Sequence, residues 1–290
     1  MSDEELPAFW EDLGLPGLAD IHVHFLPEKM LHKVWAYFDS AEENYGTSWP
    51  IAYRWSQPER LALLRKVGLR AIPALTYPHK PGMAEWLNGW TAELASDHPD
   101  VIHCATFHPE PEAGDYVRSA LDSGAQLFKA HVQIGEYDPN HELLEPIWEA
   151  LEDSRTPVVI HAGSAPLAGT YTGAQLIGGL LARHPGLVLV IAHMGMPEYH
   201  EFADLAEKYD GVHLDTTLAF TAFAENFAPV PEGYPARLAG LQEKVVLGTD
   251  FPHIPHPYAA QIQALVDLGL GEDWLRSVLW HNGARLLHLE

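Results

Sequence analysis

Eight short runs of β-branched and other apolar residues recur along the 290-residue chain, and segments with helical periodicity separate them. This alternation is typical of βα units that build a parallel sheet. Eight such units in a chain of this length predict an α/β fold, a single (β/α)8 TIM barrel domain over residues 1–290. An open, doubly wound sheet would need fewer strands, and no glycine-rich phosphate loop follows any of the runs. The predicted strands cover residues 18–25, 69–75, 101–107, 125–132, 157–163, 188–194, 211–217 and 244–251.

The longest interruption of this pattern is residues 26–57, which lie between the first predicted strand and its helix and are rich in aromatic residues. A segment this aromatic is not expected to be a disordered linker, so we predict a folded, cap-like insertion after the first strand. Its rings either cover one end of the barrel or line a pocket, and the sequence leaves both open. The rings belong to Trp35, Tyr37, Phe38, Tyr45, Trp49, Tyr53 and Trp55.

The formal net charge of -23 comes from 40 acidic and 17 basic residues without a long block of one sign, which indicates a solvated acidic surface. Such a surface argues against a nucleic-acid partner, so we expect a small-molecule substrate. The sequence has neither a signal-peptide pattern nor a membrane-length apolar run, so we expect a cytoplasmic protein with no membrane partner. Its single cysteine, Cys104, lies in an apolar run and is predicted to be a buried structural thiol.

Histidines and an aspartate end several of the predicted strands, where barrel enzymes place their active sites. Side chains alternate along a strand, so His22 and His24 share one face of the first strand while the apolar residues beside them share the other. His161 ends the fifth strand, His193 the sixth and Asp250 the eighth. Three of these histidines, His22, His24 and His161, form with Asp250 a ligand set suited to a divalent metal such as zinc, with one position left open. His193 is a further candidate, either as a ligand or as an acid or base.

Short motifs around these residues carry a family resemblance. They are His22-Val-His24, FKAH (128–131), VIHAG (159–163), IAHMG (191–195), LGTDFPH (247–253) and HNGARLL (281–287). With them the chain resembles the amidohydrolase superfamily, specifically the amidohydrolase family 2 branch that includes the aminocarboxymuconate semialdehyde decarboxylases. The resemblance implies a distorted barrel with one divalent metal ion, usually zinc, with Mn2+ or Fe2+ as alternatives. It also implies that His22, His24, His161 and Asp250 are the ligands and that His193 is the catalytic histidine.

Lys129, on the fourth predicted strand, raises the question of a second metal ion. Binuclear members of the wider superfamily bridge two metals with a carboxylated lysine on this strand. A single metal is usual in the branch that the chain resembles. We therefore interpret Lys129 and His131 as substrate contacts, and a second metal at Lys129 is the open alternative.

The resemblance leaves the reaction open between two chemistries. As a hydrolase, which is the preferred hypothesis, the protein would use a metal-activated water on a small-molecule ester, lactone or amide. Asp250 would accept a proton from this water, and His193 would stabilise the developing oxyanion or relay protons. As a decarboxylase, a carboxy-lyase, it would act on an unsaturated or aromatic carboxylic acid, for which Arg54, Lys80 and Lys129 are candidate anchors.

Two alternatives from other classes of protein remain open. A TatD-like nuclease also begins with His-x-His, but the acidic charge balance disfavours a nucleic-acid substrate. A binding or scaffold protein without activity would have no reason to keep the whole ligand set. The oligomeric state stays open, and a homodimer could use residues 26–57 or the region of Trp274 and Trp280.

Overall fold

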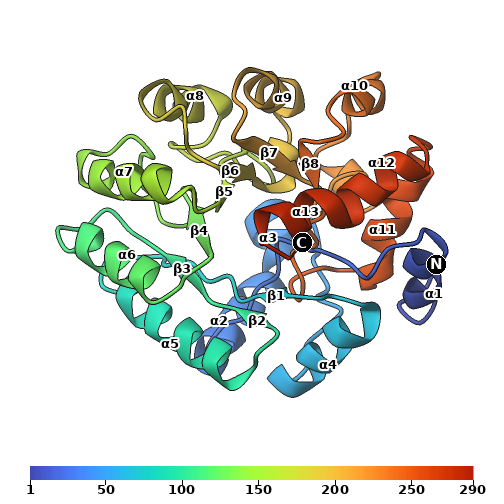
Figure 1. Cartoon of the computed structure of the whole chain (residues 1–290), viewed down its shortest axis with the longest axis horizontal. Helices are drawn as coiled ribbons and strands as arrows, with labels where there is room; N and C mark the ends of the chain where they lie inside the picture. Colours follow the sequence, from blue (N-terminus) through green and yellow to red (C-terminus); the bar gives the residue numbers. More distant parts are fainter. Residues whose placement is uncertain (290) are drawn as a thin grey trace. The chain divides into compact units, whose positions relative to one another are not determined.

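The computed structural model describes residues 1–289, in which short strands alternate with helices along the chain (Figure 1). The chain divides into two compact units. The first unit contains Met1–Ile72 and the residues from Thr216 onward, and the second unit contains Pro73–Asp215. Strand β1 (Ile72–Pro73) spans the boundary. Within residues 1–289, no helix combines the length and apolar character needed to cross a membrane.

A parallel sheet lies at the centre of the second unit. Its strands run in the order β3-β4-β5-β6-β7, and each neighbouring pair is parallel. One α-helix lies in the chain between each strand and the next, as βα units require. This arrangement confirms the predicted α/β fold. The strands of this sheet are β3 (Cys104–Thr106), β4 (Leu127–His131), β5 (Val158–His161), β6 (Leu189–Ile191) and β7 (Val212–Asp215), and β2 (Val101–Ile102) lies in the same unit but outside this sheet. The helices are α5 (Ala84–Asp97), α6 (Ala113–Asp122), η1 (Glu142–Leu144), α7 (Glu145–Ser154), α8 (Ala174–Arg183), η2 (Ala192–Gly195) and α9 (Tyr199–Lys208).

Helices make up most of the regular structure of the first unit. The aromatic segment 26–57 is folded, as predicted, because it forms α2 and α3 and continues to the start of α4. The helices are α1 (Leu6–Asp12), α2 (Glu28–Asp39), α3 (Ala41–Tyr45), α4 (Gln57–Val67), η3 (Ala224–Asn226), α10 (Tyr234–Gly240), α11 (Tyr258–Asp267), α12 (Glu272–Arg276), η4 (Ser277–His281) and α13 (Asn282–Leu286). Strand β8 (Val245–Val246) also belongs to this unit.

Helix α4 begins and ends at residues that suit those positions. Ser56 and Glu59 form a capping box, in which each side chain satisfies a backbone N–H at the start of the helix. Gly68 ends the helix with a φ of 103°, a left-handed conformation that a side chain would oppose. A Cβ atom at this glycine would also lie 2.5 Å from the indole nitrogen of Trp10. The glycine therefore lets α1 and α4 approach each other closely.

The first predicted strand, residues 18–25, is not continuous in the structure. Only isolated parallel bridges form there, joining Leu18 to Leu69 and Val23 to Phe251. The side chain of Asp20 accepts the backbone N–H of His22 at 3.0 Å, so this N–H takes no part in a strand ladder. The other seven predicted strands are each confirmed by an observed strand, although the observed strands are shorter.

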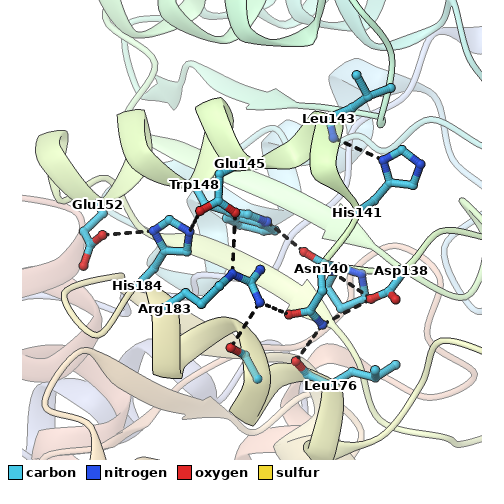
Figure 2. Close-up of polar contacts among 12 residues, drawn as sticks. Asp138, Asn140, His141, Leu143, Glu145, Trp148, Glu152, Leu176, Arg183 and His184 are labelled. Atoms are coloured by element: carbon cyan, nitrogen blue, oxygen red, sulfur yellow. Dashed lines mark hydrogen bonds and ion pairs between the residues drawn. The ribbon is translucent and has the colours of Figure 1, made fainter.

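A polar cluster joins helices α7 and α8 in the second unit (Figure 2). His184, which follows α8 and is buried, lies between Glu145 and Glu152 with a nitrogen-to-oxygen distance of 3.1 Å to each. The two glutamates are two helical turns apart, so they lie on the same face of α7. Beside them, Arg183 donates to the side-chain oxygen of Asn140, in the segment after β4, at 2.8 Å. The cluster therefore connects consecutive βα units through their helices.

Candidate metal centre

Three of the predicted ligands converge in the first unit. The Nε2 atoms of His22 and His24 are 3.1 Å apart, and the Asp250 Oδ1 atom lies 3.5 Å from the first and 3.0 Å from the second. One potential ligand atom from each residue lies within 4.8 Å of the others. Both imidazoles are buried, whereas the Asp250 side chain keeps 14% of its surface exposed. The cluster is therefore closed on the imidazole side and accessible at the carboxylate.

The outer nitrogen of His22 has a contact that fixes the orientation of the ring. Thr217 Oγ1 lies 3.0 Å from His22 Nδ1, on the opposite side of the imidazole from the cluster. Partners of this kind orient ligand histidines in metal sites. Two imidazole nitrogens and one carboxylate oxygen form a donor set that suits Zn2+, Mn2+ or Fe2+, so the residues present fit the predicted metal ion.

Asp250 holds an unusual backbone conformation. Its φ is 68°, in the left-handed region that residues other than glycine seldom occupy. Its N–H donates to His22 O at 2.8 Å, and the His24 N–H donates to Phe251 O at 2.7 Å. These two hydrogen bonds join the His-x-His segment to the segment that carries Asp250. Strained conformations of this kind persist where the surrounding structure fixes them, often at functional sites.

The carboxylate of Asp20 supports the cluster from within the core. It is fully buried and accepts the His22 N–H at 3.0 Å, the Thr249 hydroxyl at 2.6 Å and the Tyr258 hydroxyl at 2.8 Å. Burial, together with the nearby Asp20 carboxylate, holds the pKa of Tyr258 well above its usual value, so the phenol remains a hydrogen-bond donor. Asp20 thus links the first ligand, the residue before Asp250 and helix α11.

We expect Tyr258→Phe to lower the free energy of unfolding by about 1–3 kcal/mol, because it removes one donor from a buried carboxylate. We also expect weaker metal binding, because Asp20 positions both ligand segments. Urea denaturation and metal titration measure the two effects. Tyr37→Phe is the control, since Tyr37 is in the same unit and 46% exposed. Equal effects of the two substitutions would contradict a supporting role for Asp20.

The other predicted site histidines lie together in the second unit. The register of β4 and β5 places His131 beside His161, and their rings stack with centroids 4.0 Å apart at an angle of 11°. The ring of His193 lies 4.8 Å from that of His161 in an edge arrangement. Tyr77 adds a fourth ring, 4.9 Å from His131. The structure therefore groups these three histidines, and the roles assigned to them stay predictions.

His193 does not end a strand, which corrects the sequence-based placement. Strand β6 ends at Ile191, and His193 follows in the short helical turn η2 with a φ of 57°. Its N–H donates to Asp215 Oδ1, at the end of β7, at 2.8 Å. This hydrogen bond and the left-handed turn set the direction of the side chain, which the alternation of a regular strand does not describe.

Lys129 is buried in the middle of β4, with only 1% of its surface exposed. Its carbonyl oxygen accepts the Thr106 hydroxyl at 2.7 Å, which ties β4 to β3. This placement does not test either predicted role of Lys129, contact with a substrate or binding of a second metal ion. The proposed anchor Arg54 lies instead in a partly exposed ion pair with Asp39.

Two buried polar residues in the first unit were missed by the sequence analysis. His253, the last residue of the LGTDFPH motif, is 2% exposed, and its ring lies 5.6 Å from that of His24. It stacks on Phe38 of the aromatic insertion with centroids 5.7 Å apart at 17°. Arg60, in the first turn of α4, is also 2% exposed and lies 5.0 Å over the ring of Phe25. The LGTDFPH motif was the sequence signal that could have identified His253. No such signal exists for Arg60, because a charged residue in an amphipathic helix is expected on the surface.

A profile of the amidohydrolase family matches residues 19–289, so the chain belongs to this family. The match confirms the resemblance found in the sequence motifs. No curated protein sequence matches the chain.

Solved structures similar to this one cover nearly the whole chain. An uncharacterised TIM-barrel protein from Bordetella bronchiseptica has a TM-score of 0.75 at 17% identity, covering 93% of this chain and 98% of that one. A probable 2-pyrone-4,6-dicarboxylic acid hydrolase from Acinetobacter baumannii, with citric acid bound, has a TM-score of 0.62 at 14% identity and coverages of 94% and 99%. A 5-carboxyvanillate decarboxylase from Novosphingobium aromaticivorans, with manganese and 4-hydroxy-3-methoxy-5-nitrobenzoic acid, has a TM-score of 0.62 at 15% identity and coverages of 96% and 97%. At these identities the similarity establishes the fold and confirms the predicted (β/α)8 barrel class.

Proposed function

We propose that this protein is a metal-dependent hydrolase that adds water to a small-molecule ester, lactone or amide. The observation that carries the proposal is the convergence of His22, His24 and Asp250 in a member of the amidohydrolase family. Zinc is the first choice of metal, with Mn2+ or Fe2+ as alternatives. His161 is the proposed fourth ligand on the basis of its motif.

A divalent ion bound to these residues would supply Lewis acidity and would lower the pKa of a water molecule. The carboxylate of Asp250 is the proposed proton acceptor, because it is the accessible member of the cluster. Its fixed backbone hydrogen bond to His22 would keep the carboxylate oriented toward the two imidazoles during proton transfer.

His193 is the proposed second proton-transfer group, since an imidazole can both donate and accept protons near neutral pH. Its backbone contact with Asp215 would hold it in one orientation. Lys129 and His131 are the proposed substrate contacts. These three assignments rest on the sequence motifs and on the histidine cluster of the second unit.

Decarboxylation of an unsaturated or aromatic carboxylic acid is the second candidate function. The similarity to a 5-carboxyvanillate decarboxylase with manganese and a nitrobenzoic acid favours it. The same ligand cluster would position such an acid, and His193 or Asp250 would protonate the carbon atom that loses CO2.

The two functions are separated by measuring metal content, acid release and CO2 on the same holoenzyme preparation. We expect about one equivalent of divalent metal per chain and acid release without CO2 from a panel of lactones, esters and amides. Chelation should abolish turnover, and Zn2+, Mn2+ or Fe2+ should restore it. Release of CO2 from aromatic or unsaturated acids, without addition of water, would replace hydrolysis by decarboxylation. Turnover that survives complete removal of metal would contradict both.

A further inference from the structure

Helix α11 begins directly after a proline, so the residue before the helix supplies no cap. Pro257 makes no side-chain hydrogen bond to the first turn. The N–H groups of the first two helical residues, Tyr258 and Ala259, need acceptors from elsewhere, because the first turn of a helix has no intrahelical partners for them. Both residues are fully buried, so acceptors for these two N–H groups matter for the stability of the helix start.

Two residues that are distant in the sequence supply these acceptors. Tyr53 Oη accepts the Tyr258 N–H at 2.6 Å, and Asp3 Oδ1 accepts the Ala259 N–H at 2.8 Å. The second carboxylate oxygen of Asp3 accepts the Tyr53 hydroxyl, so the two capping residues also hold each other. Burial and the hydrogen bond to Asp3 hold the pKa of Tyr53 well above its usual value, so the phenol remains a donor. A carboxylate at this end of α11 also interacts favourably with the helix dipole.

The segment that carries Asp3 has its own hydrogen bonds and a second contact with α11. The N–H of Ser2 donates to Glu5 Oε2 at 2.7 Å, and the N–H of Glu5 donates to Ser2 O at 3.1 Å. The ammonium group of Met1 donates to Gln263 Oε1, further along α11, at 3.3 Å. Asp3 is therefore presented to the helix start by a short turn that is fastened to the same helix.

Tyr258 connects this helix start to the candidate metal centre. Its N–H is held by Tyr53, and its hydroxyl donates to Asp20 Oδ2 at 2.8 Å. Asp20 in turn contacts both segments that carry ligands, because it accepts the His22 N–H and the Thr249 hydroxyl. A displacement of the first turn of α11 would therefore move a donor of Asp20, and with it the two ligand segments.

We propose that Asp3 is a positioning residue for the candidate metal centre. It holds the first turn of α11 in place, both through its own hydrogen bond to the helix and through Tyr53. The Tyr258 hydroxyl is thereby kept on Asp20, which orients the two segments that carry ligands. Residues 1–5 then contribute to metal binding, although they precede the βα units. This inference rests on the proposed function, because it concerns the metal ion on which that function depends.

Titration of the metal-free protein with Zn2+, in competition with a chromophoric chelator, tests the inference. We expect Asp3→Ala to raise the Zn2+ Kd by about three- to tenfold. Asp3→Asn keeps one acceptor oxygen and should have a smaller effect. Glu4→Ala is the matched control, because it removes the same charge from the next residue, which is exposed and pairs with Lys66 at the surface. It should leave the Kd within about twofold.

A double variant separates positioning from a general loss of stability. Asp3→Ala should lower the free energy of unfolding both in wild type and in Tyr258→Phe, because the cap of α11 is lost in each. Its effect on the Zn2+ Kd should appear only in the wild-type background, because Tyr258→Phe removes the hydroxyl that connects α11 to Asp20. Urea denaturation of the metal-free protein and Zn2+ titration give the two readouts.

An unchanged Zn2+ Kd in Asp3→Ala would overturn the inference. An equal rise of the Kd in the wild-type and Tyr258→Phe backgrounds, or an equal rise in Glu4→Ala, would do the same. If Asp3→Ala does not fold, Tyr53→Phe takes its place, because it removes the acceptor of the Tyr258 N–H, and an unchanged Kd there would count equally against the inference.

The inference and the proposed function can fail separately. Wild type that binds Zn2+ but has no turnover would refute the proposed reaction alone. Normal turnover, with a Zn2+ Kd that Asp3→Ala leaves unchanged, would refute the inference alone. Wild type that binds no divalent metal would refute both.

Discussion

Asp250→Asn is expected to lower kcat by about 10²–10⁴-fold while the protein still folds. The asparagine side chain has the same shape, so one oxygen can remain beside His22 and His24 at the distances of 3.5 and 3.0 Å seen for Asp250. It carries no negative charge and cannot accept a proton. The backbone hydrogen bond from residue 250 to His22 O is unaffected, so the fold should be preserved. Steady-state kinetics, with metal content measured on the same sample, checks the prediction.

Asp267→Asn is the matched control for this substitution. Asp267 lies in the same unit at the end of α11, where it accepts a hydrogen bond from Gln263 in an exposed contact. It should leave both kcat and metal content unchanged. If Asp250→Asn kept full activity with normal metal content, Asp250 could not be the proton acceptor. Loss of metal in parallel with activity would instead identify Asp250 mainly as a ligand.

Most of the fold could be predicted because apolar runs and helix ends leave local signals. Helix α4 is observed over Gln57–Val67, with Pro58 in its first turn and Gly68 at its end, residue types that suit those positions. Residues 18–25 were predicted as one continuous strand, but only isolated bridges form there. The alternating pattern of apolar residues does not reveal that the Asp20 side chain accepts the N–H of His22. Polar groups that compete locally for the backbone are invisible to an argument from hydrophobic period alone.

The candidate ligands in the first unit could be predicted because short motifs hold them. His22, His24 and Asp250 converge, as their places at the ends of predicted strands suggested, whereas the left-handed turn that carries His193 left no signal in the sequence pattern. Arg60 and His253 could not be found in this way, because what distinguishes them is burial together with side-chain nitrogens that have no hydrogen-bond partner among residues 1–289. Whether a buried side chain has a hydrogen-bond partner depends on residues far apart in the sequence. A local sequence pattern carries no information about such residues.

The turn around His193 leads to the second large expected effect. Gly195, in the IAHMG motif, has a φ of 71°, and a Cβ atom there would lie 2.0 Å from Phe202 Cδ2. Phe202 is fully buried on α9 and has little room to move. We expect Gly195→Ala to lower the free energy of unfolding by about 2–5 kcal/mol, from backbone strain and from overpacking. Urea denaturation measures this change, and kcat should also fall because His193 is displaced.

Gly124→Ala separates the two causes of this loss. Gly124 also has a positive φ, 88°, but a Cβ atom there would meet nothing within 4 Å. Its substitution should cost only the backbone term, about 1–2 kcal/mol. Adding Phe202→Leu to Gly195→Ala should recover part of the stability, because the smaller side chain relieves the overlap and the two sites are in contact. Equal losses for the two glycines, with no recovery in the double variant, would show that steric contact with Phe202 does not fix the His193 turn.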